Sequence, residues 1–221
     1  MLLTIGYWQA IPLIGIGTIS LGWFGFVLGL IWLVGLTNAY NFMDGIDGIA
    51  GGVAIVGGLG WVLLSTNETV MLLALAVSAA SLGFLGHNWS HARIFMGDVG
   101  STLLGFTFAV FPLITNMPII GMLIMWPFIF DTMLTVVQRL VKHENILRPH
   151  RSHLYQRLVR LGFTHAQVSL LYIALTMLGV HFAWLWLNND AVLVYVLLPL
   201  CALGLWATVS YLERRRKTLT I

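Results

Sequence analysis

Long apolar runs separated by short polar segments dominate the chain. No Asp, Glu, Lys or Arg precedes Asp44, and Ile11 to Leu36 form one apolar stretch. An uncharged stretch of about 18 residues or more predicts a transmembrane helix, with the firmest span here near Leu21 to Thr37. Further spans are expected at Ile49 to Leu64, Val70 to Gly86, Thr102 to Thr115, Ile119 to Val137, Val168 to Leu187 and Ala191 to Leu212. We therefore expect an all-α, polytopic integral membrane helix bundle with about seven transmembrane helices in a single domain over residues 1–221.

Composition supports this pattern. Of 221 residues, 59% are hydrophobic and 9% charged, and the mean hydropathy is +0.91. Such a chain has too little polar surface to cover a soluble globule. Cys201 is the single cysteine, so the sequence carries neither a disulfide framework nor a cysteine metal site.

The basic residues follow the membrane topology. When the seven spans are connected, all 11 Lys and Arg residues fall in loops on one side, whereas the other side holds only Glu68 and Asp190. The positive-inside rule makes the basic side cytoplasmic. We expect a multi-pass membrane protein with a cytoplasmic C-terminus. Topology accounts for the net charge of +3, and no nucleic acid partner is expected.

The first charged stretch reads NAYNFMDGIDGIAGG, from Asn38 to Gly52. Its polar residues Asn38, Asn41, Asp44 and Asp47 recur every third position, which on a helix would form a stripe of oxygen ligands. Carboxylate and amide oxygens suit Mg²⁺, which is usually held by one or two carboxylates together with substrate phosphates. The alternative is structural, because Asp-Gly pairs also form the turns between membrane helices.

This stretch resembles the N-x-x-N-x-x-D-G-x-D-G signature of the polyprenyl-phosphate N-acetylhexosamine-1-phosphate transferases. These are integral membrane enzymes that start lipid-linked glycan synthesis. A second segment, His87 to Ser101, reads HNWSHARIFMGDVGS and is similar to another motif of the same family, with Asn88, Phe95 and Asp98 at matching positions. The alternative for Asp98 or Ser101 is an ordinary cap on the next helix.

The longest polar segment, Gln138 to His165, contains His150-Arg151-Ser152-His153. An arginine flanked by two histidines offers several donors to a diphosphate. The H-R-S-H-x-Y-Q form resembles the transferase branch devoted to O-antigen and lipopolysaccharide, including enzymes that use UDP-N-acetylfucosamine. For Arg157 and Arg160 we favour a role in orientation and in contacts with anionic lipid head groups.

Asp131 lies within the fifth expected span, where an ionised side chain is expensive unless it is paired or functional. Arg139 is eight residues further on and returns to nearly the same helix face. Structural pairing of these two residues, direct or through a third group, is the favoured interpretation.

The resemblance covers nearly the whole chain and implies transfer of an N-acetylhexosamine 1-phosphate from a UDP-sugar to undecaprenyl phosphate, with release of UMP. It implies Mg²⁺, with Mn²⁺ as an alternative, held by Asp44, Asp47 and Asp98. Asp44 and Asp47 would be catalytic; the substrates would be bound by Asn38, Asn41, Asn88, Asp98, His150, Arg151 and His153. A homodimer is compatible with this interpretation. A membrane transporter and a catalytically inactive scaffold are the alternative classes.

Members of the family also carry an adjacent Asp-Asp motif upstream of the segment matched here, and this chain has none. We therefore expect that the natural protein begins about four spans before Met1, or that a separate polypeptide supplies those helices.

Overall fold

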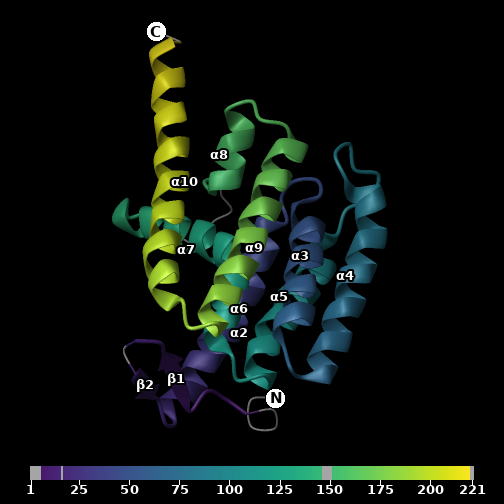
Figure 1. The fold of residues 1–221 in the computed structure, drawn as a ribbon. Helices are drawn as coiled ribbons and strands as arrows, with labels where there is room; N and C mark the ends of the chain where they lie inside the picture. Colours follow the sequence, from purple (N-terminus) through teal and green to yellow (C-terminus); the bar gives the residue numbers. More distant parts are fainter. Residues whose placement is uncertain (1–5, 16, 146–150, 220–221) are drawn as a thin grey trace.

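The computed structural model describes residues 6–15, 17–145 and 151–219. The described chain is mostly helical and confirms the expected all-α membrane bundle, with long helices packed side by side (Figure 1). The elements in chain order are β1 (Ala10–Leu13), β2 (Gly17–Ser20), α2 (Phe24–Met43), α3 (Ile49–Leu64), α4 (Glu68–Asn88), α5 (Gly97–Ile114), α6 (Pro118–Ile124), α7 (Trp126–Val141), α8 (Leu154–Arg160), α9 (His165–Leu187) and α10 (Ala191–Leu219).

The number of spans is close to the expected seven. Among the described residues, 5 helices are long and apolar enough to cross a membrane, and the bent pair of α6 and α7 would make 6. The remaining expected span is α3, which has 16 residues and falls below the usual length of a transmembrane helix. Ten of the α3 residues are buried, because α3 packs between α4 and α9 inside the bundle.

The first apolar stretch is not one continuous helix. Strands β1 and β2 pair antiparallel as a hairpin, in which Ala10 pairs with Ser20 and Leu13 with Gly17. Gly15 and Gly17 have φ values of 81° and 117°, which favour glycine and turn the chain before α2 begins at Phe24. The indole Nε1 of Trp8 donates to the carbonyl of Pro112 at 3.0 Å and ties this segment to α5.

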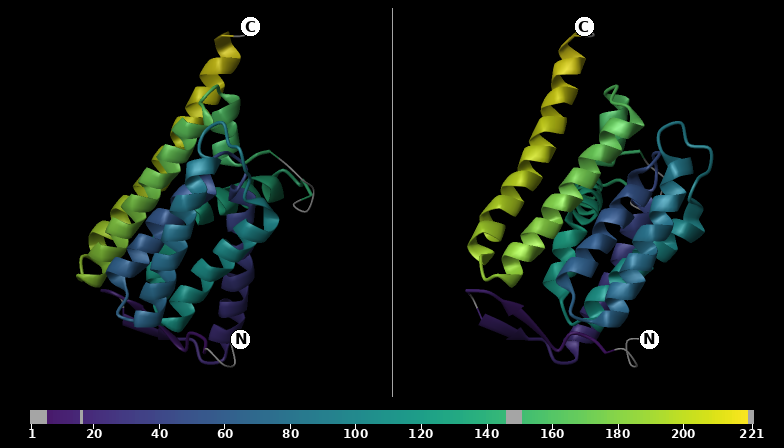
Figure 2. Two further views of the ribbon diagram at one scale, coloured as in Figure 1. Left: turned by 90° about the vertical axis from the view of Figure 1, so that its right-hand side faces the viewer. Right: turned by 45° about the vertical axis from the view of Figure 1, so that its right-hand side comes forward.

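The fifth expected span is broken as well. α6 and α7 meet at Met125 with an angle of 80° between them. Pro127 lies in the first turn of α7, where its missing N–H and its ring prevent α6 from continuing straight. As Figures 1 and 2 show, α7 therefore crosses the bundle instead of running along it.

The connections of the bundle bring the three polar segments to one end. The turn after α2, the loop after α4 and the region around α8 all lie at the end toward which the C-terminus of α10 points (Figure 1). The N-terminal hairpin lies at the opposite end. Residues far apart in the sequence therefore meet at this polar end.

Candidate functional site

The row of oxygen-bearing residues that begins at Asn38 does not continue as one helical stripe. Asn38 and Asn41 lie on the last turns of α2, which ends at Met43, so Asp44 and Asp47 lie in the turn that follows. Gly48 closes this turn with a φ of 80°, a conformation that favours glycine, and α3 begins at Ile49. Because the helix ends, the two carboxylates enter different environments.

Asp44 lies close to Asp98, which comes from the first turn of α5. The Asn41 amide joins the two helices, donating to Asp98 Oδ1 at 3.3 Å and to Ser101 Oγ at 2.9 Å. Burial, and then the negative charge of Asp98, raise the pKa of Asp44 to about 6. In the described parts of the chain no hydrogen bond to the Asp44 carboxylate offsets this shift. The pair is therefore a concentration of negative charge with which no cation of the described residues forms an ion pair.

Asp47 is bound by protein donors instead. Its Oδ2 accepts hydrogen bonds from the backbone N–H of His91 at 3.1 Å and of Ala92 at 3.3 Å, and lies 3.2 Å from His165 Nδ1. Burial acts to raise the pKa of Asp47, but these partners outweigh it and lower the pKa overall. Asp47 thus links the turn after α2, the loop after α4 and the start of α9.

The three expected metal ligands, Asp44, Asp47 and Asp98, differ in how far they are free to bind an ion. The described residues hold no group of three or more His, Cys, Asp or Glu side chains that could share an ion. Mg²⁺ needs only one or two carboxylates when substrate phosphates and water complete its shell. Asp44 and Asp98, with an unneutralised charge and an amide beside them, fit that requirement. Asp47 fits it less well because its carboxylate is already engaged.

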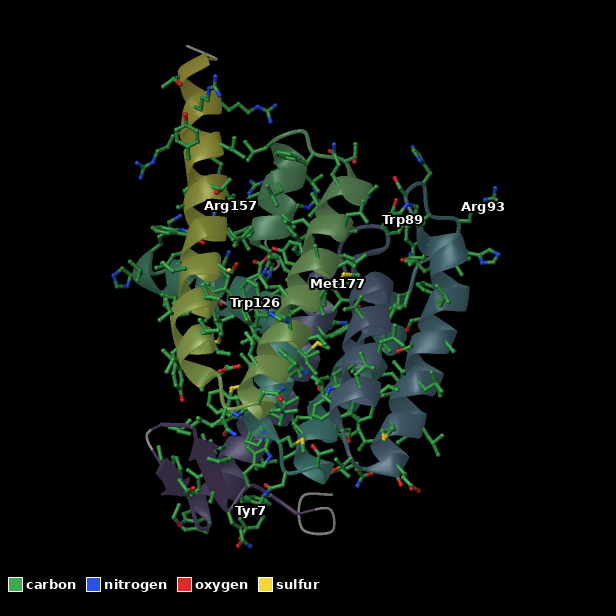
Figure 3. The ribbon with its side chains drawn as sticks, viewed as in Figure 1. Tyr7, Trp89, Arg93, Trp126, Arg157 and Met177 are labelled. Atoms are coloured by element: carbon green, nitrogen blue, oxygen red, sulfur yellow. The ribbon has the colours of Figure 1, made fainter. Side chains whose placement is uncertain are left out.

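Asn88 connects the two loops from inside the protein. Its side chain is buried, accepts a hydrogen bond from the Gly48 N–H at 3.0 Å and donates to the carbonyl of Ile94 at 2.9 Å. Trp89, labelled in Figure 3, packs over Gly48, where a Cβ atom would collide with the indole ring. Asn88 therefore positions the loops that carry Asp47 and Asp98, and its expected contact with substrate stays a prediction.

The third polar segment is only partly exposed. His150 lies outside the described residues, and Arg151 is exposed. His153 is 2% exposed, and its Nδ1 lies 3.1 Å from Asp131 Oδ1. Of the two described residues expected to bind phosphate, only Arg151 is open to a ligand in this arrangement.

Asp131 is the anchor for this segment. The backbone N–H groups of Leu154 and Tyr155 donate to its two oxygens at 2.8 and 3.2 Å, and the Tyr172 hydroxyl donates to Oδ2 at 2.5 Å. The carboxylate is fully buried, so these donors replace its hydration and fix the start of α8.

The expected pairing of Asp131 with Arg139 is wrong. Both residues are buried on one face of α7, but eight residues correspond to about 12 Å along a helix. The start of α8 reaches Asp131 instead. Arg139 binds Glu144 at 3.2 Å and the carbonyl of Asn145 at 2.5 Å.

Two residues of the site were not singled out from the sequence. The Tyr155 hydroxyl donates to the Phe42 carbonyl at 3.0 Å and lies against Gly45, where any side chain would collide with it. His165 holds Asp47. A signal existed for both, because Tyr155 belongs to the H-R-S-H-x-Y-Q motif and His165 is the last residue of the polar segment Gln138 to His165.

Comparison with known proteins places the chain in a family. The model of glycosyl transferase family 4 matches residues 1–116. A probable undecaprenyl-phosphate N-acetylglucosaminyl 1-phosphate transferase of Bacillus subtilis is 36% identical over 166 residues, which are 71% of this chain and 46% of that protein. A phospho-N-acetylmuramoyl-pentapeptide-transferase of Synechococcus is 50% identical over 102 residues, covering 44% of this chain and 30% of that protein.

A decaprenyl-phosphate N-acetylglucosaminephosphotransferase of Mycobacterium leprae is 30% identical over 205 residues, covering 77% of this chain and 51% of that protein. The chain thus spans about half the length of two of these relatives and less of the third. The family model covers more than half of the chain, including the turn with Asp44 and Asp47 and the start of α5 with Asp98. This chain belongs to glycosyl transferase family 4.

Proposed function

We propose that the chain transfers an N-acetylhexosamine 1-phosphate from a UDP-sugar to undecaprenyl phosphate. An oxygen of the lipid phosphate bonds to the sugar-bearing phosphorus, and the bond from that phosphorus to the bridging oxygen breaks. The bridging oxygen leaves with UMP, and a lipid diphospho-sugar remains. The observation that carries the proposal is the Asp44 and Asp98 pair, which concentrates negative charge at the polar end of a membrane bundle.

Asp44 and Asp98 are the residues we assign to Mg²⁺, or to Mn²⁺ in its place, with Asn41 orienting Asp98. The bound ion would neutralise charge that develops on the transferring phosphate. We assign Asp47 to positioning, because it fixes the three segments that surround the pair. This assignment narrows the sequence-based proposal that made Asp47 both catalytic and a metal ligand.

The acceptor has a matching surface beside this pair. An apolar groove of about 180 Å³ lies between α2 and α7, and its lining on α2 ends at Ala39, next to Asn38 and about one turn before Phe42. The lining residues are Ile31, Trp32, Gly35, Leu36, Ala39, Ile129, Thr132 and Met133. We place the prenyl chain in this groove and its phosphate at the level of Asn38, which is exposed.

For the donor, we assign Arg151 to the diphosphate, because it is exposed and a guanidinium can bind phosphate bidentately. His153 and Tyr155 hold the start of α8 in place for this contact. We further propose that the polar end is cytoplasmic, in a bacterial inner membrane, and that the product initiates O-antigen or a related lipid-linked glycan. The two N-acetylglucosamine relatives support an N-acetylhexosamine donor.

The test measures two things on the same purified chain in lipid nanodiscs. The first is Mg²⁺-dependent release of UMP, with transfer of labelled sugar phosphate from UDP-N-acetylglucosamine to undecaprenyl phosphate. The second is the shift in thermal midpoint caused by UMP with Mg²⁺, which does not require turnover. We expect Asp44→Asn and Asp98→Asn each to lower transfer by about 100-fold or more and to abolish the Mg²⁺-dependent shift.

Glu144→Gln is the control for loss of a carboxylate at the same end, since Glu144 is exposed and pairs with Arg139. It should leave both readouts unchanged. A Mg²⁺-dependent nucleotide shift that persists in Asp44→Asn and Asp98→Asn would show that the metal assignment is wrong.

A further inference from the structure

A second polar feature lies beside α8. It is a cavity of about 740 Å³ between α7, α8 and α10. Among the described residues that line it, Glu213 is the only carboxylate, whereas six side chains are cationic: Arg139, Lys142, Arg151, Arg157, Arg160 and Arg214. We call this the α10 cavity. Figure 3 labels Arg157, which lies where α8 approaches α10.

The α10 cavity faces away from the Asp44 and Asp98 pair. Tyr155 and Arg157 are two residues apart on α8, which places their side chains on nearly opposite faces of the helix. Tyr155 reaches Phe42 at the end of α2, whereas Arg157 reaches Glu213 on α10. α8 thus separates the candidate site from the cavity, and Arg151, at the segment before α8, is the lining residue that the proposed function also uses.

Most of the positive charge in the cavity is not compensated by the described residues. Arg157 binds both oxygens of Glu213 at 2.8 and 2.7 Å, and Arg139 binds Glu144 at 3.2 Å. The described parts of the chain contain no ion pair between a carboxylate and any of the other four cations of the cavity. The Arg216 guanidinium donates to the Arg160 carbonyl and holds α10 against α8. Paired residues therefore build the walls, and the remaining cations give the cavity an excess of positive charge.

The cavity also continues into an apolar surface. Val196, Leu200 and Leu203 of α10 are 53%, 59% and 56% exposed. Val196, Leu203 and the lining residue Ser210 are seven residues apart, so they lie on nearly the same face of the helix. Trp206 stands between the apolar and polar parts, the position that tryptophan favours at a membrane surface. An amphiphile could therefore place its charged group in the cavity and its chains against α10.

We propose that the α10 cavity binds the phosphate head group of an anionic phospholipid from the surrounding membrane, with the acyl chains along Val196, Leu200 and Leu203. Basic pockets between membrane helices are suited to such head groups, and each Lys or Arg near an anionic membrane strengthens attraction by about five-fold. Arg160 and Arg214 carry the selectivity for an anionic head group, and Trp206 sets its depth. This lipid site does not depend on transferase activity.

The experiment is native mass spectrometry of the full chain released from nanodiscs that contain phosphatidylcholine and phosphatidylglycerol. We expect one retained phosphatidylglycerol per chain. The double variant Arg160→Gln/Arg214→Gln should weaken this adduct roughly 25-fold, from about five-fold for each of the two charges. The variant Arg160→Lys/Arg214→Lys keeps both charges and should retain most of the adduct. Thermal midpoints of the variants establish that each is folded.

Arg215→Gln is the matched control, because it removes an adjacent charge of α10 that does not line the cavity. It should retain the adduct. Equal loss in Arg215→Gln, or no loss in the Arg160→Gln/Arg214→Gln variant, would overturn the proposal. Displacement of phosphatidylglycerol by inorganic phosphate would also overturn it, since the cavity would then bind a soluble phosphate.

Discussion

Two carboxylate regions of the molecule differ in what surrounds them. Asp131 is fully buried and accepts hydrogen bonds from two backbone N–H groups and a tyrosine hydroxyl. Asp44 is only partly buried, lies near a second carboxylate, and receives no hydrogen bond from the described residues. The more buried carboxylate is the better satisfied one, so burial alone does not distinguish a structural acid from a functional one.

The difference shows which carboxylate the fold needs. Removing the donors of Asp131 would leave an uncompensated charge in an apolar interior. Asp44 differs, because folding places its carboxylate near Asp98, and ionising both costs free energy that a bound cation would offset. Asp47 resembles Asp131 in this respect, because protein donors bind its carboxylate, although it lies in the same turn as Asp44.

Replacing Asp131 should have the largest effect on stability. Asp131→Ala leaves two backbone N–H groups and the Tyr172 hydroxyl without their acceptor. We expect a loss of about 3–5 kcal/mol in the free energy of unfolding, as for other broken buried ionic networks. Thermal unfolding in detergent measures the loss, and faster proteolysis between residues 151 and 160 would show that the start of α8 has detached. A variant as stable as the wild type would contradict the anchor role.

Asparagine at positions 44 and 47 should change stability in opposite directions. At pH 7 without divalent cations, Asp47→Asn loses its charge-assisted bonds to His91, Ala92 and His165, at a cost of about 1–2 kcal/mol. Asp44→Asn removes a charge that burial and Asp98 disfavour. It should therefore gain about 1 kcal/mol, after allowance for solvent screening. The test is the thermal midpoint of each variant relative to the wild type. If both midpoints shift in the same direction, the distinction between the two aspartates is wrong.

The smallest effect is the pH dependence of the Asp44 contribution. The folded-state pKa of Asp44 is about 6 and its ordinary value 3.8, so between these values the folded state binds more protons than the unfolded state. The contribution of Asp44 to stability therefore falls as pH rises through this window. The advantage of Asp44→Asn over the wild type should shrink as pH falls toward 4 and disappear below it. A pH-independent difference in midpoint, measured without Mg²⁺, would contradict the raised pKa.

Membrane insertion was predictable from the sequence because apolar length alone decides it. The chain positions of α4, α9 and α10 follow directly from runs without charge. The N-terminal hairpin and the bend between α6 and α7 were not predictable from the sequence, because both lie inside apolar runs. Hydropathy does not report backbone direction, which depends here on Gly15, Gly17 and Pro127.

The motifs predicted which segments would meet, but not the contacts that each residue makes. The motifs located the turn after α2, the start of α5 and the segment around Arg151, and the structure brings the first two together. Helical periodicity then misplaced Asp47, because the helix ends at Met43. The buried state of His153 and the role of Asp131 depend on contacts between residues 22 positions apart, which no local pattern records.

In the proposed function, the bend at Met125 bears on the route by which the lipid acceptor reaches the protein. α6 has 7 residues and rises about 10 Å, a third of the roughly 30 Å apolar layer, before α7 turns aside. The flank between α2 and α7 thus opens toward the leaflet, and a prenyl carrier would arrive by diffusion in two dimensions. Its encounter frequency would follow the mole fraction of carrier in the membrane. Diluting a membrane suspension with buffer would leave that frequency unchanged, whereas adding inert lipid would lower it.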